Sequence, residues 1–246
     1  MLEWDPGPPP AFANHFENRP NYTPWKKRFR MAWGPIFYRG RLDGSAKVIV
    51  IGQDPATDED VARRTLVGDA GQKVQGFLSK LGLVRSYAMV NTFLYGLKGQ
   101  ADTEARQISS APAIKAWRNT LLDMVATPQT QAVLAFGASA QQVIDLWPNG
   151  HNFFVARLTH PSARDTAALL QNWNQSLPAL RQRVTPDAGG TPSNTTYGTS
   201  FKPSDIVRIP ARDLPFGVPQ WLGSGDTAAR TKGKDAITWM PTAAEG

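Results

Sequence analysis

The sequence predicts an α/β fold: a three-layer α/β/α sandwich around a central, mainly parallel four-stranded sheet. Two patterns predict it. Four short apolar runs resemble strands buried on both faces of a sheet, and helical periodicity fills the intervals between them. Parallel pairing is favoured because strands and helices alternate along the chain. Hydrophobic residues make up 41% of the 246 residues, which is enough to form a core.

The four predicted strands consist mainly of β-branched, aromatic and other apolar residues, and the first three stop at a glycine or an asparagine. They are Val48–Ile51, Tyr87–Val90, Ala132–Phe136 and Phe153–Leu158. The predicted helices have apolar residues every three or four positions, the spacing of one helix face. They are Gln72–Leu81, Ile114–Val125, Ala138–Trp147 and Ala167–Leu180.

We expect residues 1–184 to form one domain, with the proline-rich and aromatic segment 1–45 packed on it. Residues 185–246 are rich in glycine and proline, and their aromatic side chains predict that this extension packs on the same domain. Short strands are predicted within it at Ile206–Ile209 and Ile237–Met240, because the surrounding prolines prevent long regular elements.

Composition excludes several kinds of chemistry. The chain contains no cysteine, which excludes disulfides, thiolate metal sites, a cysteine nucleophile and cysteine-ligated iron–sulfur clusters. A formal net charge of +7 favours a polyanionic partner such as nucleic acid. No run of about 18 apolar residues predicts a membrane span, and the first residues lack the pattern of a signal peptide. We therefore expect a cytoplasmic monomer that binds no membrane.

Polar residues follow three of the predicted strands. Gly52-Gln53-Asp54-Pro55 follows the first, Asn91 ends the second, and His160-Pro161-Ser162 follows the fourth. Because parallel strands end at the same edge of a sheet, a carboxylate, an amide and an imidazole should meet there. Each residue alone also fits an ordinary role in a turn or a cap.

These segments resemble the motifs of the uracil-DNA glycosylase superfamily in order and separation, over about residues 34–182. Gly52-Gln53-Asp54-Pro55 is similar to the first motif of family 1, and Leu66-Val67-Gly68-Asp69-Ala70-Gly71 to a loop of family 4. The chain departs from both families. It lacks the cysteines of family 4, has Ala56 where family 1 has a tyrosine that excludes thymine, and has Leu66 where an aromatic ring stacks on the base.

The resemblance implies hydrolysis of the N-glycosidic bond of deoxyuridine in single- or double-stranded DNA, without cofactor or metal. Asp54 would stabilise the sugar cation and orient water, and His160 would donate to uracil O2. Asn91 would read uracil O4 and N3–H. The remaining residues expected to line the uracil pocket are Gln53, Leu66, Ala56 and Phe77, with Phe93 as an alternative ring.

The target base has to leave the duplex, and the loop after His160 is the expected wedge. Arg164 stands where family 1 has a leucine. Ser162 and Pro161 are expected to contact DNA beside it, although Ser162 also fits a helix cap. The basic run Lys26–Arg30 fits either a phosphate track or a surface helix. No lysine lies in the matched motifs, so a monofunctional enzyme is expected.

Three alternatives remain at this stage. The first is a catalytically weak module that binds uracil or abasic DNA. The second is a glycosylase of broader specificity that accepts hypoxanthine or thymine mispairs, because Ala56 and Leu66 leave a roomier pocket. The third is an unrelated α/β hydrolase that uses Ser139 or Ser162, although the chain has no Gly-x-Ser-x-Gly elbow.

Overall fold

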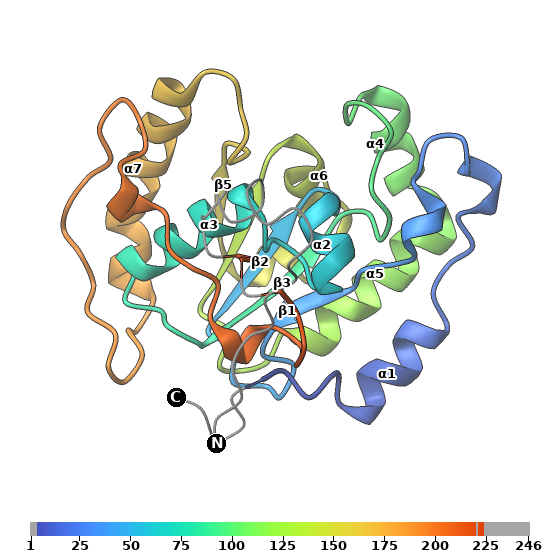
Figure 1. The fold of residues 1–246 in the computed structure, drawn as a ribbon, viewed down its shortest axis with the longest axis horizontal. Coiled ribbons are helices and arrows are strands. Elements are labelled where there is room, and N and C mark those ends of the chain that lie inside the picture. Colours follow the sequence, from blue (N-terminus) through green and yellow to red (C-terminus); the bar gives the residue numbers. More distant parts are fainter. Residues whose placement is uncertain (1–3, 220, 224–246) are drawn as a thin grey trace.

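A computed structural model describes residues 4–219 and 221–223 of the chain (Figure 1). Its central sheet has five strands in the order β1-β3-β2-β4-β5, with β1 antiparallel to β3 and the other neighbours parallel. The strands are β1 Tyr38–Gly40, β2 Val48–Gly52, β3 Tyr87–Asn91, β4 Ala132–Phe136 and β5 Phe154–Leu158. The predicted α/β architecture is confirmed, but the sheet has five strands rather than the predicted four.

Helices cover both faces of the sheet, which makes three layers (Figure 1). The helices are α1 Pro10–Glu17, α2 Thr57–Ala62, α3 Asp69–Lys80, α4 Thr103–Ser109, α5 Pro112–Val125, α6 Ala138–Leu146 and α7 Thr166–Arg183. One apolar core joins α3 and α7 to one face of the sheet, and a second joins α1, α5 and α6 to the other. Each central strand is buried on both faces, as its apolar sequence predicts.

The unpredicted strand, β1, carries a charged residue in a buried position. Arg39 is fully buried in this strand. Because a charged residue stands at this position, the short segment lacks the apolar run by which the other strands are predicted. Gly40 allows the close approach to β3, because it has a positive φ of 93° and a Cβ there would lie 2.3 Å from the Tyr87 carbonyl oxygen.

The extension after α7 returns along the domain and contacts the sheet edge and α3. The Asp187 carboxylate accepts backbone N–H bonds from Val84, Arg85 and Ser86 at 2.9–3.0 Å. Asp205 passes so close to α3 that a Cβ on Gly76 would lie 1.9 Å from its carbonyl oxygen.

The predicted strand at Ile206–Ile209 is wrong. That segment is irregular, because Val207 N–H bonds to Gln72 O on α3 and Ile209 N–H bonds to Gly223 O, so no sheet edge receives it. The other predicted strand, Ile237–Met240, lies outside the described residues.

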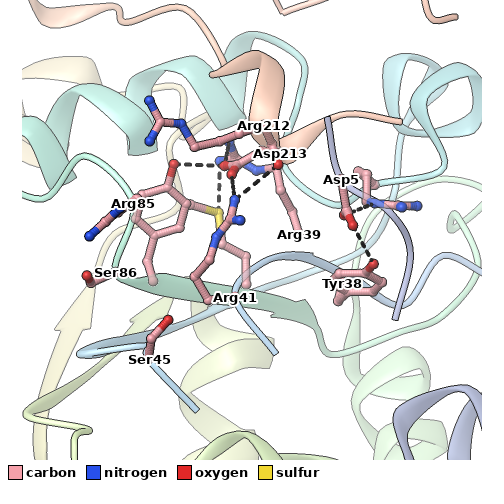
Figure 2. Close-up of polar contacts among 12 residues, drawn as sticks. Asp5, Tyr38, Arg39, Arg41, Ser45, Arg85, Ser86, Arg212 and Asp213 are labelled. Atoms are coloured by element: carbon pink, nitrogen blue, oxygen red, sulfur yellow. Dashed lines mark hydrogen bonds and ion pairs between the residues drawn. The ribbon is translucent and has the colours of Figure 1, made fainter. Parts of the chain in front are cut away.

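Two buried carboxylates, one before α1 and one after α7, tie their segments to β1 (Figure 2). Asp213, fully buried, accepts hydrogen bonds from Arg39, Arg41 and the hydroxyl of Tyr87. Asp5 accepts from Tyr38 at 3.1 Å and pairs with Arg64 at 2.6 Å. The charge on Arg39 is therefore compensated inside the protein, which is why it is tolerated in a strand. Among the described residues, no helix is both long and apolar enough to cross a membrane.

Candidate active site

The polar residues that follow the strands meet at one edge of the sheet. The parallel register pairs Gly52 with Asn91, so Gln53 and Asp54 emerge beside Asn91. It also pairs Phe136 with Leu158, so Gly137 emerges next to the segment that carries His160. Since β2 and β4 are neighbours, the carboxylate, amide and imidazole predicted to converge are at the same end of four parallel strands.

Asp54 is held by hydrogen bonds to both of its oxygens. Leu97 N–H donates to Oδ2 at 2.8 Å, and the Gln53 side-chain amide donates to Oδ1 at 3.0 Å. Burial raises the pKa of Asp54 above its usual 3.8, and the Glu59 carboxylate adds to the rise, while the two hydrogen bonds oppose it. The carboxylate is thus fixed in position, and it forms no direct ion pair within residues 4–219 and 221–223.

Asn91 is the unusual polar group of the site. Its side chain is only 4% exposed, and neither its amide nitrogen nor its amide oxygen has a hydrogen-bond partner among the residues that the structure describes. Gly52 makes room for it, because a Cβ on that glycine would lie 2.4 Å from Asn91 Oδ1 and 3.4 Å from a methyl carbon of Leu66. Buried amides are nearly always paired, so this one is suited to a ligand with one donor and one acceptor.

Leu66 places its side chain next to Gly52, beside the Asn91 amide. It is 6% exposed and adopts a left-handed backbone with φ of 54°, which is uncommon for a residue other than glycine. The first turn of α3 presses against its backbone, since a Cβ on Gly71 would lie 1.7 Å from Leu66 O. Leu66 is therefore held in an uncommon conformation beside the unpaired amide.

A hydrogen bond selects one tautomer of the neutral His160 ring. Ser162 N–H donates to Nδ1 at 3.2 Å, so in the neutral ring the proton is on Nε2. Burial lowers the pKa of His160 below its usual 6.5, and the nearby Lys73 ammonium lowers it further. Gly137 lies against the ring, at a positive φ of 87° and with its Cβ position 3.1 Å from the His160 Cβ. The site thus presents a neutral imidazole with Nε2–H as a donor.

Glu59 joins the two loops that form the site. It is 5% exposed and accepts N–H bonds from Ala56 at 2.9 Å, Val67 at 2.8 Å and Gly68 at 3.1 Å. The role of Glu59 is not visible in the sequence, because the run Asp58-Glu59-Asp60 resembles the solvated first turn of a helix.

Comparison with known proteins identifies the family. The family model of the Uracil DNA glycosylase superfamily matches residues 39–188, which is more than half of the chain. The chain belongs to this superfamily. No curated protein matches the sequence. Membership of the uracil-DNA glycosylase superfamily supports a glycosylase that acts on DNA, and the match covers every segment of the site described above.

Not every residue predicted for the pocket of this superfamily member lies at the strand ends. Phe77 is fully buried in the core, with edge contacts to Phe136 and Trp173 at 6.0 and 5.3 Å, so its ring cannot stack on a base there. Phe93 is also fully buried. Ala56 is exposed at the start of α2, adjacent to the site.

The predicted DNA-contacting residues lie just past the imidazole. Ser162 and Arg164 are exposed, and Pro161 is buried with its carbonyl 3.4 Å from Lys73 Nζ. Ser162 does not cap α7: that helix begins at Thr166, and Asp165 accepts the capping N–H bond of Ala168 at 2.9 Å.

The basic run Lys26–Arg30 is not a helix. It is a turn followed by one extended residue, Phe29, which pairs with Leu97. Within the described ranges, no group of three or more histidine, aspartate or glutamate side chains is placed to hold a metal ion.

Proposed function

We propose that the protein is a monofunctional glycosylase that hydrolyses the N-glycosidic bond of deoxyuridine in DNA, releasing uracil and leaving an abasic site. The observation that carries this proposal is the buried, unpaired amide of Asn91 beside Gly52 and Leu66. Uracil O4 and N3–H offer the acceptor and donor that this amide lacks. With the amide oriented to pair with uracil, cytosine presents the reverse pattern and leaves both amide atoms unpaired, which costs about 1–3 kcal/mol each.

The two groups predicted to be catalytic fit the charges of this reaction. Breaking the glycosidic bond leaves positive charge on the sugar and negative charge on the uracil. The Asp54 carboxylate, fixed by Leu97 and Gln53, supports the first charge and orients the attacking water. The Nε2–H of neutral His160 donates to uracil O2 and supports the second.

In double-stranded DNA the target base has to be extruded from the base stack before its glycosidic bond can be cleaved. We propose that the exposed Arg164, on the loop after His160, fills the gap left in the base stack. Ser162, exposed on the same loop, is proposed to bind a phosphate. Action as a monomer in the cytoplasm stays a prediction from the sequence.

Ala56 favours one variant of this proposal. The side chain at this exposed position beside the site is a methyl group, where the resembling family 1 enzymes have a tyrosine that excludes thymine. A glycosylase that also accepts thymine mispairs or hypoxanthine is therefore the second candidate. Release of each base from otherwise identical duplexes separates the two.

The Asn91→Leu variant tests the proposal. Replacing an unpaired buried amide by an apolar group of similar size should raise Tm, while the loss of two hydrogen bonds to uracil lowers kcat/KM by about 10²-fold. Thr92→Val is the matched control, since the Thr92 hydroxyl donates to Gly52 O at 2.9 Å and its removal should lower Tm. A lower Tm for Asn91→Leu, with uracil release unchanged, would show that the amide is structural.

A further inference from the structure

We propose that Arg30, stacked on Trp33, binds the DNA phosphate that flanks the extruded deoxyuridine; this contact rests on the function proposed above and identifies where the damaged strand enters the site. The segment that carries Arg30 is part of neither the motifs of the site nor the loop after His160.

The backbone places Arg30 beside the catalytic carboxylate. Phe29 pairs antiparallel with Leu97, and Arg30 N–H donates to Gly96 O at 2.8 Å. Leu97 is the residue whose N–H holds Asp54 Oδ2 at 2.8 Å. The basic segment is therefore hydrogen-bonded to the very segment that fixes Asp54, and the positive charge of Arg30 contributes to the field at that carboxylate.

Phe29 anchors this placement. Its side chain is fully buried, with ring centroids 5.0 Å from Tyr22 and 5.6 Å from Phe93. An anchored neighbour on one side and a hydrogen-bonded N–H of its own hold the backbone of Arg30 beside the site.

Arg30 is available to a ligand, in contrast to its neighbour Arg28. Arg28 pairs with Asp102 at 2.7 Å and with Glu104 at 3.3 Å. Arg30 is exposed, and its guanidinium lies over the Trp33 ring, 4.8 Å from the ring centroid. Within the described residues the guanidinium forms no hydrogen bond or ion pair. It does not pair with Asp54, whose oxygens already accept bonds from Leu97 and Gln53.

Trp33 is a rigid support for this guanidinium. Its ring lies 3.0 Å from the Cβ position of Gly96, which in turn is 2.6 Å from the Pro55 carbonyl oxygen, so any larger residue than glycine would collide with both. Arg63 donates to the carbonyls of Trp33 and Pro35, which holds the ring's own loop against α2. The ring is thus packed directly against the backbone next to Asp54.

The chemistry of this pair suits a phosphodiester. A guanidinium that stacks through its face keeps the N–H groups at its edge free, and two of them match two phosphate oxygens. The phosphates of DNA are bonded to the same deoxyribose whose C1′ Asp54 acts on. A strand that brings C1′ to Asp54 therefore brings a flanking phosphate to Arg30, an unpaired cation hydrogen-bonded into the same loop.

Neutralising phosphates one at a time tests this contact. The probe is a short single-stranded oligonucleotide with one 2′-fluoro-deoxyuridine, which resists cleavage, and a methylphosphonate at one position in each member of the series. We expect Arg30→Gln to raise Kd about tenfold and to reduce the salt dependence of binding by about one phosphate contact. For the wild type, one methylphosphonate next to the uracil should cost the same tenfold, and for Arg30→Gln that substitution should cost nothing further.

Three variants make the result specific. Arg85→Gln removes another exposed arginine, at the opposite end of β3 near the Asp187 contact, and should leave Kd unchanged. Arg30→Lys keeps the charge but not the planar stacking, and should bind with intermediate affinity. Trp33→Leu removes the support and should weaken binding about threefold.

An unchanged Kd for Arg30→Gln would overturn the contact. So would losses of affinity from Arg30→Gln and from the methylphosphonate that are additive at every position. Uracil release by the wild type is measured on cleavable DNA in parallel. Release together with normal DNA binding by Arg30→Gln rejects the contact and keeps the proposed function. If the wild type releases no uracil, the proposed function is rejected. The phosphate contact then stands only if Arg30→Gln has a higher Kd than Arg85→Gln.

Discussion

Replacing Glu59 by glutamine should disturb both stability and catalysis, because this one carboxylate accepts three backbone N–H bonds. Glutamine has a single acceptor oxygen. If that oxygen keeps Val67 and Gly68, the side-chain NH₂ faces the N–H of Ala56, donor against donor. Losing charge-assisted hydrogen bonds of this kind costs about 1.5–3 kcal/mol, which corresponds to a Tm lower by about 3–12 °C in a chain of this size.

The same change should slow uracil release. Glu59 holds the start of α2 to the turn after Leu66, so its loss moves the pocket wall relative to Asp54, and misplacement by about 1 Å costs up to about 10²-fold in rate. Glu59 also contributes to the raised pKa of Asp54, so the acid limb of the rate should move to lower pH in Glu59→Gln. A general loss of stability does not predict that movement.

Thermal unfolding and single-turnover release at several pH values measure these effects. Asp60→Asn is the control, since Asp60 is the next residue and forms only a partly exposed ion pair with Arg63, worth about 0–1 kcal/mol. Equal Tm and equal rates in Glu59→Gln and Asp60→Asn would refute the reasoning.

Three further predictions follow from burial and charge. Single-turnover release should fall in acid with a midpoint above pH 3.8, because Asp54 with its raised pKa must be ionised and His160 with its lowered pKa must be neutral; a midpoint at or below pH 3.8 would contradict the assignment of Asp54. Asp54→Asn should lower release by at least about 10²-fold, and relative to this variant the wild type should lose Tm as the pH rises from 3.8 through the raised pKa of Asp54, because a raised pKa in the folded state means that ionising the carboxylate costs stability; a Tm difference between the two that does not change with pH would argue against this. Asp213→Ala should cost about 3–5 kcal/mol by leaving the buried Arg39 uncompensated, and Arg39→Met in the same chain should recover much of the loss; equal denaturant midpoints for wild type and Asp213→Ala would contradict the burial argument.

The central strands were predictable because local sequence and tertiary position agree. The run at residues 48–51 is β-branched and apolar, and the strand is buried on both faces. β1 was not predictable, since Arg39 enters the core only because Asp213, far along the chain, compensates its charge. A local pattern does not reveal a partner supplied by the opposite end of the sequence.

The site shows the same division. Asp54, Asn91 and His160 were predictable, because strand ends place them at one edge. Glu59 was not, because only the fold shows that its carboxylate is buried among three N–H groups. Phe77 illustrates the opposite case: its place in the apolar face of α3 already predicted a core residue, and the structure follows that periodicity rather than the expectation that its ring would reach the pocket in place of Leu66.

Single-turnover cleavage of labelled DNA carrying uracil opposite guanine or adenine tests the central claim most directly, with the wild type beside Asp54→Ala and His160→Ala. Our account predicts that the wild type releases uracil and that both variants are slower by at least about 10²-fold. Release that survives Asp54→Ala nearly intact would contradict the two-group mechanism. No release from any uracil-containing substrate, with tight DNA binding retained, would contradict the enzyme itself and leave a module that binds damaged DNA.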